Sequence, residues 1–167
     1  MCVIDTAAKE AVVGRFLRDH PDAGRDGATH PALRGCAEVP WADLPGCPAG
    51  LPALLHALLD ERAAPEAVRV LTNVLLDGVF RMGAAMPAAL PFVIRLAACP
   101  DVPVRSGLAD LVAVAAELAE PVDPGDERAV RLWGSDADHP ERARCRAVLA
   151  AHAALVRPMM FDDAPPA

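Results

Sequence analysis

The amino-acid sequence predicts an all-α fold, a short α-solenoid of consecutive helix pairs with a flexible N-terminal loop. Hydrophobic residues make up 53% of the 167 residues, yet aromatic residues make up only 4% and tyrosine is absent. A core built mainly from alanine, leucine and valine favours closely packed helices over a sheet. Seventeen prolines and eleven glycines indicate that these helices are short and bounded by turns. The length suits one domain, so we expect residues 1–167 to form a single helical domain.

The first element is predicted to be a helix over residues 1–18, because its apolar side chains recur at steps of three and four residues. They are Val3, Ile4, Ala7, Ala8, Ala11, Val12, Phe16 and Leu17. Residues 19–38 are rich in Gly, Pro, Asp and His and have no periodicity, which predicts a loop. We expect Trp41, which follows, to pack against the next helix.

Two helix pairs are predicted over residues 39–119. The helical segments read "LPALLHALLDE", "PEAVRVLTNVLLDGVFRMG", "LPFVIRLAAC" and "VRSGLADLVAVAAELAE". The first three carry a proline near the start, where the missing N–H costs nothing. Between the last two, Pro100 and Pro103 are expected to end one helix and shape the turn into the next. The polar residues 120–141 are predicted to be a linker, and residues 142–156 a final helix.

The two pairs also repeat one another. Residues 51–55, "LPALL", align with residues 90–94, "LPFVI", at an offset of 39. A period near 40 that contains two helices is typical of HEAT-like repeats. The predicted solenoid is therefore HEAT-like.

Several motifs support this interpretation through a resemblance to a known family. The chain resembles the N-terminal part of bacterial, actinobacterial-type HEAT-repeat proteins over about residues 39–156. The positions that match the family pattern are Trp41, Leu44, Pro52, Pro91, Phe92, Pro103, Arg105 and Cys145. The chain departs from the pattern at "LLDGVFRMGAAMP", where the family often carries a His-Gln-Gly stretch. The resemblance implies the helical fold, and it implies no particular activity.

Charge and hydropathy exclude several kinds of partner. The formal net charge is −7 and no Arg/Lys cluster is present, so we expect no nucleic acid to bind. No apolar run is long enough for a spanning helix, so we expect no membrane association. The N-terminus lacks the pattern of a secretory signal, and the five cysteines include no CxxC, as in reduced cytoplasmic proteins. The remaining partners are another protein or a small molecule.

The first functional hypothesis is a protein-interaction module without catalysis. On a helix over residues 66–82, Arg69, Asn73, Asp77 and Arg81 would share one polar face. The second helices of a solenoid line its concave surface, which is the usual binding face. An ordinary solvated face is the alternative explanation for this row. If the row binds a partner, Asn73→Ala with Asp77→Ala should weaken that binding and leave the melting temperature unchanged.

The second hypothesis is a small-molecule-binding protein or an enzyme of a biosynthetic or modification pathway. Its apolar pocket would lie between the helices and be lined by Phe80, Met82, Met86 and Phe92. His56 is a weak candidate for a general base, and would need a carboxylate such as Asp77 or Asp110 close by. A hydrogen-bonded structural histidine is the alternative. The sequence contains none of the common catalytic motifs, so catalysis is not favoured.

Metal-ligating residue types gather in the predicted loop. They are His20, Asp22, Asp26, His30 and Cys36. Their spacings match no zinc signature. We therefore expect no metal site and no cofactor.

Overall fold

A computed structural model describes residues 5–23 and 30–161 of the chain. Within this part the protein is all-α, with eight α-helices and 62% of the residues helical. The helices are α1 Thr6–Asp19, α2 Leu51–Ala57, α3 Ala64–Leu75, α4 Met86–Ala97, α5 Arg105–Ala119, α6 Glu127–Trp133, α7 Pro140–Ala151 and α8 Ala153–Phe161. Two 3-10 turns, η2 Pro31–Leu33 and η3 Trp41–Asp43, and one antiparallel hairpin, β1 Leu76–Gly78 with β2 Arg81–Met82, complete the described elements.

The four helices of the two predicted pairs are present as α2, α3, α4 and α5. The prolines in the first turns of α2 and α3 are Pro52 and Pro65, as expected. Helix α4 begins earlier than predicted, because Pro87 takes the first-turn position and Pro91 falls inside the helix. Residues 98–104 connect α4 to α5, so the turn that contains Pro100 and Pro103 lies where the sequence predicts it.

The prediction of one helix over residues 66–82 is wrong, because α3 ends at Leu75 and a hairpin follows. Gly78 has a φ of 152°, which no residue of an α-helix adopts and which glycine reaches without a Cβ penalty. The Gly83 N–H donates to the carbonyl oxygen of Leu75 at 2.7 Å and closes the hairpin at its base. The Asp-Gly pair at positions 77 and 78 therefore acts as a turn signal inside an apolar run.

Two segments predicted to be irregular contain packed or helical structure. Within the predicted flexible loop, Ala32, Leu33 and Cys36 are buried, and the indole N–H of Trp41 donates to the Cys36 carbonyl at 2.8 Å. Within the predicted linker, Asp126 caps α6 by accepting hydrogen bonds from the backbone N–H groups of residues 128 and 129. The predicted final helix is divided into α7 and α8.

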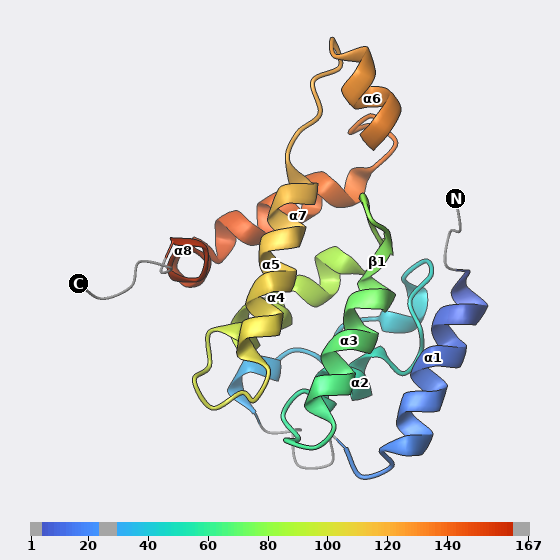
Figure 1. The fold of residues 1–167 in the computed structure, drawn as a ribbon, viewed down its shortest axis with the longest axis vertical. Helices are drawn as coiled ribbons and strands as arrows, with labels where there is room; N and C mark the ends of the chain where they lie inside the picture. The colour runs from blue at the N-terminus through green and yellow to red at the C-terminus, as the bar shows by residue number, and fades with distance from the viewer. Residues whose placement is uncertain (1–4, 24–29, 162–167) are drawn as a thin grey trace.

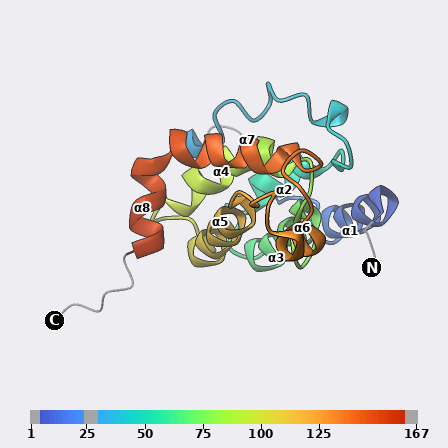
Figure 2. The ribbon, with the colours of Figure 1, turned by 90° about the horizontal axis from the view of Figure 1, so that it is seen from above.

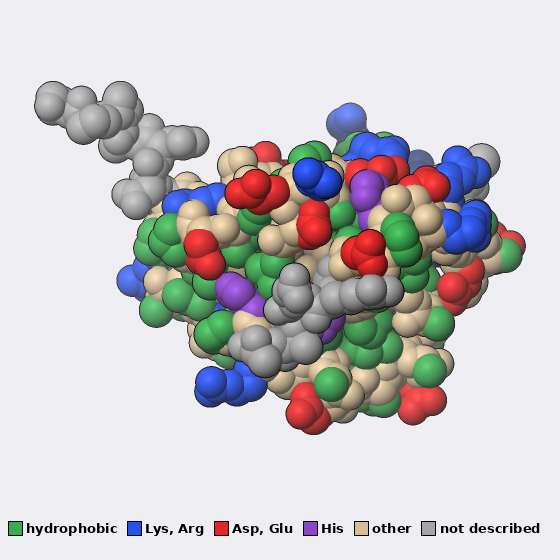
Figure 3. Space-filling model, turned by 90° about the horizontal axis from the view of Figure 1, so that it is seen from below, with side chains coloured by type: hydrophobic (Ala, Val, Ile, Leu, Met, Phe, Trp, Pro, Cys, Tyr) green, Lys and Arg blue, Asp and Glu red, His purple; other side chains and the backbone are tan. Residues whose placement is uncertain are grey.

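The helices form two groups around one continuous core. Helices α1, α2 and α3 contact one another on one side, and α4, α5 and α7 pack together on the other. The segment that carries α6 projects from the top of this body, and α7 passes behind α5 below that segment (Figure 1), while Figure 2 shows α7 beside α4. The opposite end, in Figure 3, carries histidine and acidic side chains among hydrophobic ones. None of the helices in the described part has the length and hydropathy needed to cross a membrane.

The buried face of α1 differs from the predicted stripe. Lys9, Val13 and Phe16 are buried, whereas Val12, which the pattern placed on the stripe, is exposed. Val3 and Ile4 lie outside the described residues. A hydrophobic pattern cannot predict a buried lysine, because burial of an ammonium group depends on an anion that another element supplies.

Candidate functional site

An apolar patch lies where the hairpin meets α6. We define it as Val79, Phe80, Leu132 and Trp133. Val79 is 82% exposed, Phe80 46% and Leu132 58%, and they are three of the six large exposed hydrophobic side chains of the described residues. The rings of Phe80 and Trp133 meet edge to face with their centroids 4.8 Å apart. Exposed apolar patches on soluble proteins mark sites of interaction.

An acidic pocket of about 310 Å³ adjoins the patch and shares Trp133 with it. Four of its lining residues are carboxylic acids: Glu117, Glu120, Asp123 and Asp126. The basic residues of the neighbouring elements, Arg81, Arg128 and Arg131, do not line it. Its one basic lining residue, Arg142, is buried and paired with Asp136. The pocket therefore carries net negative charge beside an aromatic ring, an arrangement that favours a cation.

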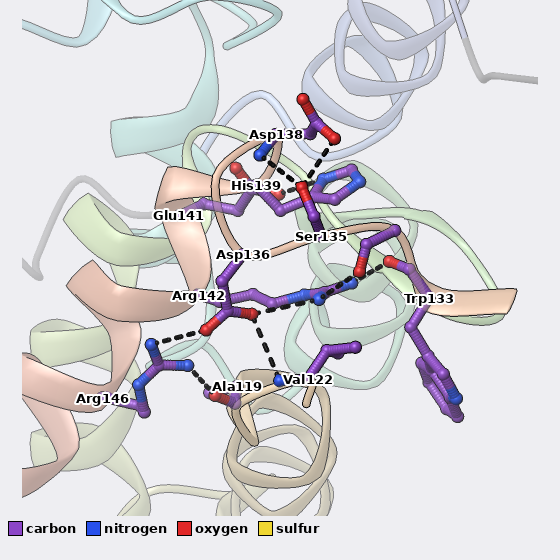
Figure 4. Close-up of polar contacts among 11 residues, drawn as sticks. Ala119, Val122, Trp133, Ser135, Asp136, Asp138, His139, Glu141, Arg142 and Arg146 are labelled. Carbon is purple, nitrogen blue, oxygen red and sulfur yellow. Dashed lines mark hydrogen bonds and ion pairs between the residues drawn. The ribbon is translucent and has the colours of Figure 1, made fainter. Parts of the chain in front are cut away.

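Arg142 and Arg146, together with Asp136, hold the end of α6 in place, and we call these three residues the arginine clasp (Figure 4). Arg142 donates to the carbonyl oxygens of Trp133 and Gly134, and to Asp136 Oδ1 at 3.3 Å. Arg146 donates to Asp136 Oδ2 at 2.9 Å. In Figure 4 the Trp133 ring points away from this network. The clasp thus fixes the backbone of α6 and leaves the ring free for the patch.

The Asp136 carboxylate is the centre of the clasp. Burial raises its pKa, but hydrogen bonds from Arg146, from the backbone N–H of Val122 and from Arg142 outweigh burial, so the net pKa is below the ordinary value. A carboxylate whose pKa is lowered on folding contributes stability above its unfolded pKa of about 3.9. That contribution is lost as the pH falls through the folded value.

We predict from this shift that Asp136→Asn destabilises the protein at neutral pH and that the difference from wild type shrinks as the pH falls below about 4. Urea unfolding followed by circular dichroism at a series of pH values measures that difference. Asp43→Asn, at an exposed carboxyl of η3, is the matched control and should change stability at neutral pH by no more than about 0.5 kcal/mol. A difference for Asp136→Asn that stays constant into the acid range would contradict the role of the carboxylate.

Asp77 has a structural partner, which corrects its predicted role on a solvated binding face. Its carboxylate forms an ion pair with Lys9 of α1, whose side chain is only 5% exposed, while that of Asp77 is 29% exposed. A Cβ atom at Gly83 would lie 3.3 Å from both the Lys9 Nζ and the Asp77 Oδ1, so glycine leaves room for the pair. The ion pair is a physical reason to expect that loss of Asp77 lowers the melting temperature, contrary to the expectation from sequence.

The other three predicted binding residues are exposed but do not share a helical face with Asp77. Arg69 lies on α3 and contacts Glu66 at 3.4 Å. Asn73, also on α3, borders a small cavity together with Lys9. Arg81 begins β2, opposite Gly78 in the hairpin register. The turn at Gly78 separates the row that the helical pattern predicted.

Within the described part of the chain, the residues predicted to form a catalytic site or an apolar pocket are not brought together. The Nδ1 atom of His56 is buried without a hydrogen-bond partner among the described residues, and the hydrogen bonds and ion pairs of those residues include none from His56 to Asp77 or Asp110. Of the four predicted pocket residues, Met82, Met86 and Phe92 belong to the core, and Phe80 is exposed in the patch. These four side chains do not line one pocket.

The metal-ligating residue types of the predicted loop are not brought together as a set. His20 pairs with Glu66 at 3.0 Å, Cys36 is buried in the core, and Asp26 lies outside the described residues. His30 instead lies beside Cys99 and Asp101 of the α4–α5 connection. These three are the described side chains whose types and placement suit a metal ion.

The sequence contains signals for the patch that periodicity alone does not reveal. "DGVF" places two large apolar side chains directly after a turn signal, and "DERAVRLW" begins with a helix cap and ends in two large apolar residues.

Comparison of the chain with protein-family models, with curated proteins and with solved structures finds no match. The functional argument therefore rests on the geometry.

Proposed function

We propose that this protein is an interaction module that binds a basic, apolar segment of a partner protein where the apolar patch meets the acidic pocket. The observation that carries the proposal is the exposure of Val79, Phe80 and Leu132 beside a pocket lined by four carboxylic acids. Apolar side chains of the partner would cover the patch. An arginine or lysine of the same segment would enter the pocket.

The two surfaces would contribute differently to binding. Burial of aromatic and large aliphatic side chains supplies most of the energy at protein interfaces, concentrated in a few central residues. The carboxylates would orient the partner and raise its association rate, an effect that salt screens. A guanidinium in the pocket would also lie near the Trp133 ring, where a cation–π contact adds about 0.5–2 kcal/mol.

The proposal keeps the predicted interaction module and moves its binding surface away from the face of α3. It also keeps the HEAT-like interpretation of α2 with α3 and of α4 with α5, which is supported by the contact between the two helices of each pair. A cytoplasmic location remains part of the proposal. The acidic net charge of −7 supports a basic partner.

The proposal predicts that Phe80→Ser combined with Leu132→Ser abolishes capture of the specific partner from a lysate of the native cell. Both side chains are exposed, so the fold should remain intact. The matched control is Leu155→Ser with Met160→Ser, which removes two exposed apolar side chains of α8 outside the patch. The control should retain the partner. Equal recovery by all three proteins would contradict the proposal, as would a captured partner that binds through an acidic segment.

A further inference from the structure

Three side chains of metal-ligand type converge from two distant parts of the chain. His30 lies directly before η2, whereas Cys99 and Asp101 belong to the connection between α4 and α5. One ligand atom of each, a ring nitrogen, a sulfur and a carboxylate oxygen, lies within 4.8 Å of the other two. The connection between α4 and α5, residues 98–104, lies toward the lower end of the molecule in Figure 1.

One of these separations matches the edge of a tetrahedral zinc site. Zinc–nitrogen and zinc–oxygen bonds of about 2.0–2.2 Å and a zinc–sulfur bond of about 2.3 Å place neighbouring ligand atoms about 3.3–3.6 Å apart. The distance from His30 Nε2 to Asp101 Oδ2 is 3.6 Å, so these two atoms already stand at about one tetrahedral edge. Imidazole with thiolate is a donor set that suits zinc and does not suit magnesium or calcium.

Existing contacts hold these ligand atoms only weakly. The 3.6 Å between His30 Nε2 and Asp101 Oδ2 exceeds the length of a good hydrogen bond, and the Asp101 side chain is 75% exposed. The Cys99 Sγ donates one weak hydrogen bond, to the carbonyl oxygen of Arg95 at 3.2 Å. Little interaction energy is therefore lost when a metal ion recruits Cys99 and Asp101.

The His30 ring makes one contact that metal binding must break. Its Nδ1 accepts the N–H of Ala32 at 3.2 Å, so the neutral ring carries its proton on Nε2. Coordination through Nε2 moves that proton to Nδ1 and removes the bond to Ala32. Because Ala32 is buried, leaving its N–H without an acceptor weakens binding by about 5- to 150-fold, which is small beside the many orders of magnitude that zinc coordination supplies.

We propose that His30, Cys99 and Asp101 bind one Zn²⁺ ion, with a water molecule in the fourth position. Cys99 binds as the thiolate and its proton passes to the solvent. Asp101 binds through one carboxylate oxygen, and His30 binds through Nε2. Three protein ligands and an open fourth position are the arrangement of zinc sites that can activate a bound water. The site shares no residue with the patch or the acidic pocket, so the test of zinc binding is independent of the test of the proposed function.

Cobalt(II) binding to the reduced, full-length protein after chelator treatment tests the site. We expect one equivalent of Co²⁺ to produce a thiolate-to-cobalt charge-transfer band that Zn²⁺ abolishes on displacement. Cys99→Ser should remove the band, and Cys2→Ser, the thiol control, should leave it unchanged. No band in the wild type, or a band that survives Cys99→Ser, would overturn the site.

Two further variants separate ligation from folding. His30→Asn keeps a side-chain acceptor for the Ala32 N–H, because asparagine is a good capping residue, but it removes the Nε2 ligand. Asp101→Asn alters an exposed side chain and should leave the circular dichroism spectrum and melting temperature of the metal-free protein unchanged. Each should weaken Zn²⁺ binding, measured by competition with a chelating dye, by more than about 100-fold, beyond the loss expected for an outer-shell partner. Unchanged affinity in either variant overturns its assignment as a ligand.

Discussion

Asp77→Ala is expected to lower the free energy of unfolding by about 3–5 kcal/mol, the cost of leaving a buried charge without its partner. The Lys9 side chain is only 5% exposed and pairs with Asp77. Without the carboxylate, its ammonium group would remain in the interior with no counterion. Urea unfolding of the variant and the wild type measures the difference.

The reverse change should cost less, because the two partners are buried to different extents. In Lys9→Met the remaining charge belongs to Asp77, whose side chain is 29% exposed and can be hydrated. The double variant Lys9→Met with Asp77→Asn removes both charges, and should recover most of the stability that Asp77→Ala loses. If Asp77→Ala proved as stable as the wild type, the buried ion pair would have no structural role.

Phe92→Ala is expected to cost about 3–5 kcal/mol, because it empties a well-packed part of the core. The Phe92 ring is buried, contacts the Trp41 ring at a centroid distance of 6.0 Å, and lies 4.8 Å below the Arg95 guanidinium carbon. Leu55→Ala, at a fully buried side chain of α2, should cost about 2–5 kcal/mol. Chemical denaturation gives both values.

The matched control for these core changes is Val79→Ala in the exposed patch. Val79 is 82% exposed, so its truncation should change stability by no more than about 0.5 kcal/mol. A loss at position 79 as large as the loss at position 92 would mean that the hairpin tip is packed in solution.

Much of the helical framework could be predicted from sequence because its physical signals are local. Leucine and alanine spacing together with first-turn prolines indicates α2 and α3, and the Pro100–Pro103 connection marks the boundary between α4 and α5. Leu55 and Phe92 lie in two of the predicted helical segments, and both are in the core. In these cases the spacing of residues three or four positions apart is enough to predict the helix and its buried face.

The remaining features depend on partners that are distant in sequence. Periodicity places the apolar residues beyond Leu75 on a continued helix, but Gly78 turns the chain and the Gly83 N–H returns to Leu75. The burial of Lys9 requires Asp77, which is 68 residues away. A pattern of residues a few positions apart cannot reveal a contact between residues so far apart in the sequence.

The candidate sites were missed for the same reason. The apolar patch exists because Phe80 of the hairpin meets Trp133 of α6, and α6 itself was predicted to be linker. The zinc ligands come from residue 30 and from residues 99 and 101, so spacing within the predicted loop could not reveal them. Arg69, Asn73 and Arg81 are exposed, as expected of a polar row, but the hairpin separates that row.

The most direct test of the proposed interaction surface is a fluorescence titration that uses Trp133 as the reporter. The Trp41→Phe background leaves Trp133 as the sole tryptophan. The ligand is a short amphipathic peptide of leucine and arginine, and the control peptide has glutamate in place of arginine. We predict a saturable change in Trp133 emission with the arginine peptide alone, weakened by salt and lost in Phe80→Ser with Leu132→Ser. No saturable change with the arginine peptide, or an equal response to both peptides, would contradict the account.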